Sequence, residues 1–252
     1  MQYKEHWVFR GLTVRHAYQD GKDGNVRGFQ IYKSNNLKFL ECVSHDNGGP
    51  GFVIQDCDTI HFRYCDSYNN CDSLGTSGAK LGGKADGFQA YNYSGTQEDT
   101  LSWSMLYFDQ CRAWNNSDDG WDFLNNVRAR VDSSWSIGNG ALDGDGAGMK
   151  AGLIGLNPPS KQYIFTNNLS VYNIYGFRDN CNNMSAHIDS RWYNNITAFN
   201  DTYGFVGSIG EGLMNTNIYR NNSVFECPVL NQWEPGGEII HDHNSFDIIP
   251  TL

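Results

Sequence analysis

The sequence is poor in charged residues, in proline and in long apolar runs. Charged side chains make up 18% of the 252 residues, and there are only 6 prolines. No stretch approaches the ~20 consecutive apolar residues that a transmembrane helix needs, so we expect no membrane partner. The N-terminus also has no basic and apolar leader of the kind that forms a signal peptide. We interpret the abrupt start at Met1 as that of a fragment or a trimmed chain without an N-terminal cap.

Clusters of lysine and arginine are missing as well. The 18 basic side chains are outnumbered by 28 acidic ones, which gives a formal charge of -10. Proteins bind a phosphate backbone through grouped cations, so nucleic acid is excluded as a partner. A polyanionic substrate is compatible with this charge only if a bound cation reverses the sign locally.

Cysteines in the spacing of a zinc or redox motif are also absent. The seven cysteines are odd in number and include no Cys-x-x-Cys pair. Disulfides in an oxidising compartment and buried free thiols both remain open. Glycine and aromatic residues are abundant instead, with 28 glycines, 14 tyrosines and 14 phenylalanines. This composition favours many short strands joined by turns and argues against a helical bundle.

A glycine followed by a large apolar residue recurs along the chain, at spacings of 23, 36, 33, 28, 28 and 28 residues. The seven glycines are Gly28, Gly51, Gly87, Gly120, Gly148, Gly176 and Gly204. Units this short cannot bury an apolar face alone and must stack on their neighbours, and their apolar residues alternate with period two. We predict an all-β right-handed parallel β-helix of about eight coils, one domain over residues 1–252. A β-sandwich with irregular loops is the alternative, but it does not explain the recurring glycine.

Equivalent positions of successive coils lie above one another in a β-helix. Residues at the same distance in sequence from the recurring glycine therefore form a column along the stack. The residue after each glycine is large and apolar, so this column should point inward. The residue two places after the glycine then points outward. That column places Asp122, Lys150 and Arg178 on three consecutive coils, about 5 Å apart. The residue before the glycine is Asp86 in one coil and Asp119 in the next.

Four carboxylates should therefore converge on one small volume. They belong to Asp86, Asp118, Asp119 and Asp122. Carboxylates this close repel one another unless they are protonated or neutralised. Four aspartates suit a hard cation such as Ca²⁺, whereas zinc prefers histidine or cysteine. Any one of these aspartates taken alone is more often a structural turn residue. The alignment of Asp118, Asp119 and Asp122 with Asp86 and Lys150 on neighbouring coils favours a calcium site.

Lys150 and Arg178 are the candidate catalytic residues. Lys150 lies in the glycine-rich stretch "LDGDGAGMKAG", where little side-chain bulk covers it. Arg178 has an alternative role as an ion-pair partner of Asp179 or of other neighbouring acids. The candidate substrate contacts are Arg178, Asn180 and Tyr91, and the aromatic side chains expected to be exposed for sugar stacking are Tyr91, Trp114 and Trp233.

Four segments together resemble the successive motifs of polysaccharide lyase family 9, which comprises calcium-dependent pectate lyases and related enzymes on a right-handed parallel β-helix. They are "KADGF" (84–88), "CRAWNNSDDGWD" (111–122), "GAGMKAG" (146–152) and "YGFRDN" (175–180). The resemblance covers roughly residues 35–225, and "NNSDDGWD" is its most specific part. It implies that the four aspartates named above bind calcium and that Lys150 is the catalytic lysine.

This resemblance implies cleavage of a uronic-acid polymer by calcium-assisted β-elimination. The substrate class is acidic plant polysaccharide (pectin), with homogalacturonan first and rhamnogalacturonan I as the alternative. A base removes the proton at C5, next to the C6 carboxylate, while a cation stabilises the developing charge. Lys150 can act as this base if its pKa is lowered, which we expect from nearby Ca²⁺ and Arg178. We also expect a monomer located outside the cell or in the periplasm.

Two other classes of protein remain as alternatives. An inverting glycosidase of this shape uses paired carboxylates and needs no lysine, and the Gly-His-Gly and Arg-Ile-Lys elements of polygalacturonases are absent from the chain. A non-catalytic carbohydrate-binding β-helix would hold a structural calcium in the same aspartates. Such a module has no need for a base at Lys150.

Overall fold

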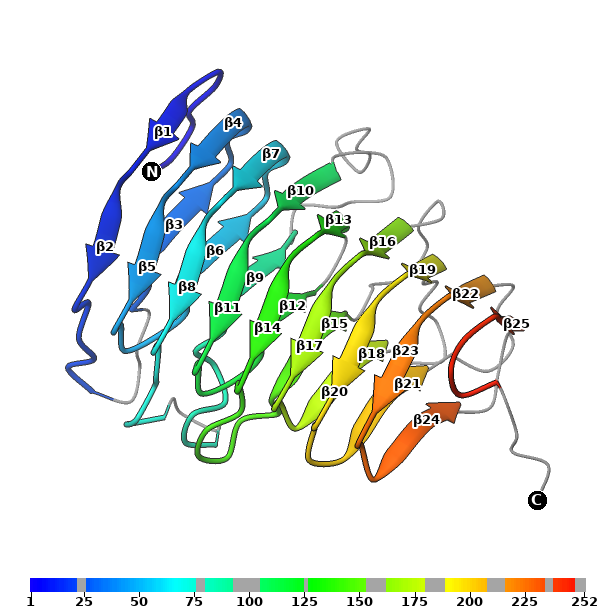
Figure 1. Cartoon of the computed structure of the whole chain (residues 1–252). Helices are drawn as coiled ribbons and strands as arrows, with labels where there is room; N and C mark the ends of the chain where they lie inside the picture. The colour runs from blue at the N-terminus through cyan, green and yellow to red at the C-terminus, as the bar shows by residue number, and fades with distance from the viewer. Residues whose placement is uncertain are drawn as a thin grey trace.

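The chain is wound into a long parallel β-helix in the computed structural model (Figure 1). The structure describes residues 1–21, 26–75, 80–92, 105–124, 127–152, 162–179, 189–207, 216–233 and 238–247. Within these ranges the chain forms 25 strands and no helix. A helix of the length and apolarity needed to cross a membrane is accordingly not found in the described part of the chain.

Every third strand along the chain joins the same sheet, and all pairs are parallel. Sheet 1 has nine strands: β1 (Val8–Arg10), β4 (Asn35–Leu40), β7 (Asp58–Arg63), β10 (Met105–Asp109), β13 (Arg128–Asp132), β16 (Gln162–Thr166), β19 (Asp189–Tyr193), β22 (Thr216–Arg220) and β25 (Glu238–Asp242). Sheet 2 has eight: β2 (Thr13–Arg15), β5 (Val43–His45), β8 (Asp66–Tyr68), β11 (Arg112–Trp114), β14 (Trp135–Ile137), β17 (Leu169–Val171), β20 (Ile196–Ala198) and β23 (Ser223–Phe225). Sheet 3 has eight: β3 (Phe29–Tyr32), β6 (Phe52–Gln55), β9 (Phe88–Tyr91), β12 (Trp121–Phe123), β15 (Ala147–Ala151), β18 (Tyr175–Asp179), β21 (Tyr203–Gly207) and β24 (Val229–Trp233).

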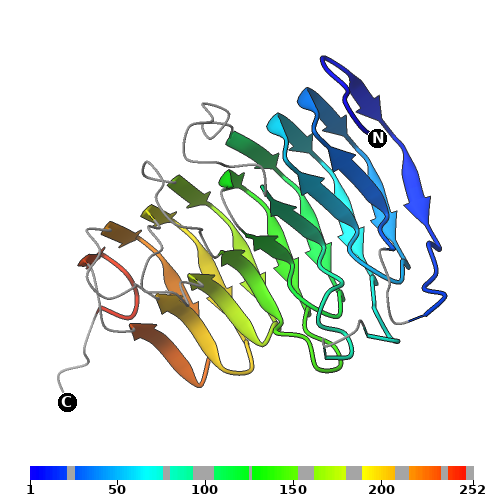
Figure 2. The same ribbon diagram turned by 180° about the vertical axis from the view of Figure 1, so that it is seen from behind.

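The strands make eight coils of three strands each, from β1–β3 to β22–β24, and β25 follows the last coil. The prediction of about eight coils is therefore confirmed, and the parallel pairing of all three sheets rules out a β-sandwich. Sheet 3 is seen in the view from behind (Figure 2). Strands β1 and β25 lie at opposite ends of the stack.

The inward column has the register that the glycine spacing predicts. Phe29, Phe52, Phe88, Trp121, Met149, Phe177 and Phe205 are paired in this order from coil to coil. The aromatic rings of neighbouring coils stack on either side of Met149, with centroids 4.7 Å apart between Phe29 and Phe52 and 5.0 Å apart between Phe88 and Trp121. Parallel β-strands of neighbouring coils lie at nearly the spacing of stacked rings, so one large apolar residue per coil fills this part of the core.

The corner between sheets 2 and 3 explains the recurring glycine. A Cβ on Gly120 would lie 2.4 Å from the carbonyl oxygen of Gly148 and 2.4 Å from Oγ of Ser136. No side chain fits at such distances, so the register depends on glycine at this position. A ladder of buried asparagines runs through the same corner, formed by Asn47, Asn70, Asn116, Asn139, Asn173 and Asn200. The Asn116 amide donates to Asn139 and the Asn139 amide donates to Asn173, both over 2.9 Å. This network fixes the turns that begin sheet 3.

A second buried column occupies the corner between sheets 1 and 2. Its members change along the helix from thiol to hydroxyl to amide: Cys42, Cys65, Cys111, Ser134, Asn168, Asn195, Asn222 and Asn244. The cysteines of the described residues are all free, and only Cys71 among them is partly accessible. Buried free thiols, one of the two alternatives left by the sequence, are thus what this part of the chain contains.

Candidate active site

The candidate residues lie on the outward face of sheet 3 and on the turns that lead into it. Asp86 precedes β9, Asp118 and Asp119 precede β12, and Asp122 lies within β12. Strand pairing places Asp122 beside Lys150 in β15, and Lys150 beside Arg178 in β18. The outward column predicted from the sequence therefore has the predicted register.

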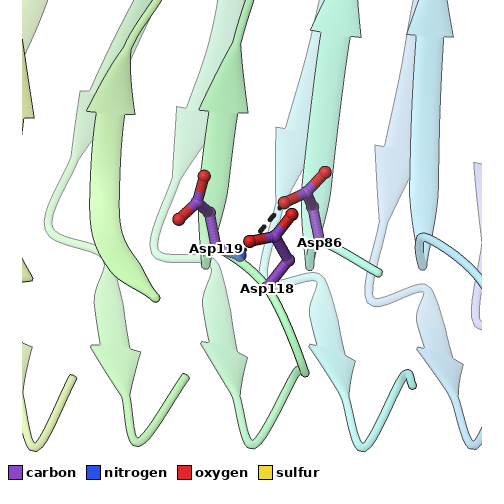
Figure 3. Close-up of side chains that lie close together, drawn as sticks. All are labelled: Asp86, Asp118 and Asp119. Atoms are coloured by element: carbon purple, nitrogen blue, oxygen red, sulfur yellow. Dashed lines mark hydrogen bonds between the residues drawn. The ribbon is translucent and has the colours of Figure 1, made fainter. Parts of the chain in front are cut away.

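Three of the four aspartates form one compact cluster. Carboxylate oxygens of Asp86, Asp118 and Asp119 all lie within 4.8 Å of one another, and all three residues are buried. The three side chains lie next to one another where β9 and β12 begin (Figure 3). The Asp119 amide donates to Oδ1 of Asp86 over 3.0 Å, which ties the two coils together at this point.

Hydrogen bonds from the surrounding chain fix the orientation of these carboxylates. The backbone amide of Asp145 donates to Oδ1 of Asp118 over 2.7 Å, and that of Ala147 donates to Oδ1 of Asp119 over 2.6 Å. The Gln89 side-chain amide donates to Oδ2 of Asp86 over 2.8 Å. Each carboxylate of the cluster therefore has at least one oxygen fixed by a hydrogen bond.

Burial and mutual repulsion raise the pKa values of the aspartates in this cluster. Burial raises the pKa of Asp86 well above its ordinary value, and the neighbouring carboxylates raise it further. Burial and then the charge of Asp119 raise the pKa of Asp118 to about 8. Burial also raises the pKa of Asp122 to about 6, against the opposing effect of Lys150. Burial and the neighbouring charges therefore oppose the ionisation of these acids.

Lys150 is the basic side chain beside this cluster. Its Nζ lies 2.5 Å from Oδ2 of Asp119 and 3.3 Å from Oδ1 of Asp122. Burial by itself lowers the pKa of Lys150, but the charges of Asp119 and Asp122 outweigh it and raise the pKa well above its ordinary value. The prediction that Ca²⁺ and Arg178 lower this pKa concerns the protein with bound Ca²⁺, and it stays a prediction. The positive charge of Arg178 on the adjacent strand does not offset these two carboxylates.

The donor set fits a calcium ion on chemical grounds. Asp86, Asp118 and Asp119 would hold the ion with Asp122 beside them, and Lys150 balances only one of their four charges. The buried Oδ1 of Asp122 has no hydrogen-bond partner in the described part of the chain, although it lies in ion-pair range of Lys150. Carboxylate oxygens without nitrogen or sulfur donors suit a hard divalent cation.

Arg178 borders the site on the next coil. Its Nη1 lies 3.6 Å from Oδ2 of Asp145, and its guanidinium lies 4.9 Å from the ring centre of Tyr175. The alternative pairing with Asp179 does not occur, because Asp179 points into the core and accepts hydrogen bonds from Tyr219 and Ser190. Arg178 remains partly exposed next to Lys150.

The expected sugar-stacking residues are buried or partly covered by their neighbours. The expectation that Tyr91 is exposed is wrong: it is 7% accessible and its hydroxyl donates to Gln55 over 3.3 Å. The Trp114 ring lies flat on Tyr68, with centroids 4.3 Å apart, and the Arg112 guanidinium lies 5.7 Å from the centre of the Trp114 ring. Trp233 packs against Tyr219 at the end of the core. Asn180 lies outside the described residues, and its role stays a prediction.

Sequence reasoning missed several neighbours of the site. Gln89 belongs to the same outward column as Asp122, yet its amide gave no signal of a contact with Asp86. Tyr175 and Tyr203 continue the column of residues that precede the recurring glycine, the column that holds Asp86 and Asp119. Register alone could have identified these two tyrosines. Asp145 could not be found in this way, because it lies on a turn that belongs to no column.

The fold and the site define a parallel β-helix protein with a candidate metal site on one sheet face. The chain belongs to the family described as Pel9A-like, right-handed β-helix region, whose family model matches residues 1–222. This match confirms the resemblance to polysaccharide lyase family 9 and the right-handed β-helix.

Relatives and solved structures agree with this assignment. Pectate lyase L of Dickeya dadantii (strain 3937) is 25% identical over 92% of this chain and 52% of its own length. Pectate lyase L of Dickeya chrysanthemi is 26% identical over 86% of this chain and 47% of its own length. The chain thus spans about half the length of the curated relatives it matches. The crystal structure of pectate lyase Pel9A matches all of this chain and 57% of its own, with a TM-score of 0.71 at 24% identity. A rhamnogalacturonan lyase matches 97% of this chain and 61% of its own, with a TM-score of 0.67 at 24% identity.

Proposed function

We propose that this protein cleaves a uronic-acid polymer of the pectate type by calcium-assisted β-elimination. The observation that carries the proposal is Lys150, which lies on the outward face of sheet 3 in contact with the aspartate cluster. A cation site alone is equally compatible with a structural calcium. A buried lysine between a cation site and an arginine is what proton abstraction next to a carboxylate requires.

The reaction breaks the bond between C4 and the glycosidic oxygen. A base takes the C5 proton, the electron pair of the C5–H bond forms the C4–C5 double bond, and the C4–O pair leaves with the oxygen. A bound Ca²⁺ would supply positive charge next to the substrate carboxylate, where negative charge grows in the transition state. Asp86, Asp118, Asp119 and Asp122 would hold the ion.

Lys150 receives the C5 proton at Nζ, and Arg178 binds the substrate carboxylate from the neighbouring coil. Lys150 must be unprotonated to do so, which the carboxylates of Asp119 and Asp122 oppose. A cation bound among these carboxylates would offset their charge and lower the pKa of Lys150. This dependence couples the base to the occupancy of the cation site. Arg178 adds a second positive charge on the other side of Lys150.

A rhamnogalacturonan backbone is the second candidate substrate, since a rhamnogalacturonan lyase shares this fold with a TM-score of 0.67. Both polymers carry a galacturonate carboxylate next to the proton that is removed, so one set of residues serves both reactions. A pectic substrate also implies a location outside the cell or in the periplasm, and we retain the prediction that the protein is a monomer in one domain.

The test is a polysaccharide screen with and without Ca²⁺, read by ultraviolet absorbance of the unsaturated product. Lys150→Ala should lower the rate at which this absorbance rises by at least ~10²-fold, the lower limit for loss of a general base. Its circular dichroism spectrum in Ca²⁺ should stay that of the wild type. Lys38→Ala is the matched control, because Lys38 is exposed on sheet 1. Near-normal activity of Lys150→Ala would exclude the base, and full activity in excess chelator would exclude an essential cation. Saturated products would indicate a hydrolase, and binding without any product would indicate a carbohydrate-binding module.

A further inference from the structure

Asp145 lies on the turn between β14 and β15 and is anchored through its backbone. Its amide donates to Oδ1 of Asp118 over 2.7 Å. The preceding residue, Gly144, packs closely on the turn that carries Ser117 and Asp118. An added Cβ on Gly144 would lie 1.9 Å from the carbonyl oxygen of Ser117. The backbone at Asp145 is therefore held in one place beside the cluster.

The side chain of Asp145 faces the two basic groups of the site. Its Oδ2 lies 3.9 Å from Nζ of Lys150 and 3.6 Å from Nη1 of Arg178. The exposed fraction of the side chain is 49% for Asp145, 22% for Arg178 and 6% for Lys150. Asp145 is thus the most solvent-accessible member of this group, on the side from which a soluble polymer arrives.

These two contacts are weak enough to be exchanged. Both distances exceed that of a hydrogen bond, and half-exposed ion pairs of this kind contribute little to stability. The backbone anchor of Asp145 does not involve its carboxylate, so the side chain can turn away while the turn stays in place. A carboxylate on a sugar ring could make the same two contacts with its own oxygens.

We propose that the Asp145 carboxylate holds, in the free protein, the place that a uronate carboxylate takes at Lys150 and Arg178. The inference rests on the proposed function and adds a residue to it. The substrate carboxylate replaces Asp145 beside Lys150 and Arg178, and the Asp145 side chain turns to solvent. Asp145 therefore competes with acidic sugars and weakens their binding, and it does not affect neutral sugars.

The experiment compares two sugars that differ in this carboxylate. D-galacturonate, which has no glycosidic bond to cleave, and D-galactose are titrated calorimetrically into the wild type and Asp145→Asn in saturating Ca²⁺. Asp145→Asn should bind galacturonate about three- to tenfold more tightly, the range expected from losing two weak ion pairs. Galactose binding should not change. Asp143→Asn is the matched control, because Asp143 is an exposed acid of the same turn that makes no ion pair with a described residue.

Unchanged or weaker binding of galacturonate by Asp145→Asn overturns the inference, as does an equal gain for galactose or for Asp143→Asn. A weaker binding would show that Asp145 positions the site or binds the cation. Failure of the proposed function is seen separately, as the absence of unsaturated product from the wild type on every polymer. If product forms, KM for polygalacturonate should fall in Asp145→Asn by the same three- to tenfold factor, with kcat unchanged.

Discussion

Replacement of Asp118 by asparagine should have opposite effects on stability with and without calcium. The variant keeps the shape of the side chain and the oxygen that accepts the Asp145 amide, but it removes one charge. Burial first, and then the charge of Asp119, raise the pKa of Asp118 from 3.8 to about 8. At ~1.36 kcal/mol for each pKa unit, a shift of about four units corresponds to a free energy of the order of 5 kcal/mol.

The sign of the effect follows from proton binding. In chelator the folded protein retains a proton on Asp118 that the unfolded chain loses above about pH 4. The stabilisation from the raised pKa is fully present below that pH and is lost as the pH rises to about 8. Asparagine cannot ionise, so Asp118→Asn should match the wild type near pH 4. At pH 8 the free energy of unfolding of Asp118→Asn should exceed that of the wild type by up to ~5 kcal/mol, which corresponds to roughly 10–20 °C in Tm for a chain of this size.

Saturating calcium should reverse the order of the two proteins at pH 8, because the variant has lost one charged donor. The stabilisation by calcium must exceed the gap of ~5 kcal/mol, which needs roughly a 10⁴-fold excess over the Kd, since a hundredfold excess supplies only ~2.7 kcal/mol. We would measure Tm by circular dichroism at pH 4, 6 and 8, in chelator and in Ca²⁺. An Asp118→Asn variant that is less stable than the wild type in chelator at pH 8, or that gains as much from Ca²⁺, would refute the metal site.

Two further predictions concern the core. Burial raises the pKa of Asp179 to about 7, so the wild type should lose ~1.4 kcal/mol per pH unit relative to Asp179→Asn between about pH 4 and pH 7. Urea unfolding at pH 5 and pH 7 measures this, and an equal pH dependence of both proteins would contradict it. Asn139→Ala should cost several kcal/mol, at ~1–3 kcal/mol for each buried group left unpaired, because the Asn116 amides lose their acceptor. Asn115→Gly, which keeps a left-handed backbone at an exposed position, is the control and should change stability by less than ~0.5 kcal/mol. A similar loss of unfolding free energy in both variants would show that the asparagine ladder does not contribute to stability.

Much of the fold could be predicted because a β-helix makes sequence distance and spatial neighbourhood equivalent. One glycine per coil fixes the corner, since no larger residue fits at Gly120. Counting from that glycine gives both the inward aromatic stack and the outward neighbours Asp122, Lys150 and Arg178, and the strand pairing has this register. The asparagine and cysteine columns follow from the same stacking.

The sequence by itself determined which residues share a column, and with that the meeting of Asp86 and Asp119 on adjacent coils. The tertiary structure decided what the turns bring to those columns and how deeply each side chain is buried. Tyr91 occupies an outward position yet is covered, and Asp145 reaches Lys150 from a turn of irregular length. The charge state of Lys150 was also decided at this level, because a pKa depends on distances to every neighbouring charge and on solvent exclusion. Periodicity specifies strands, whereas contacts made by turns depend on the path of each turn in three dimensions.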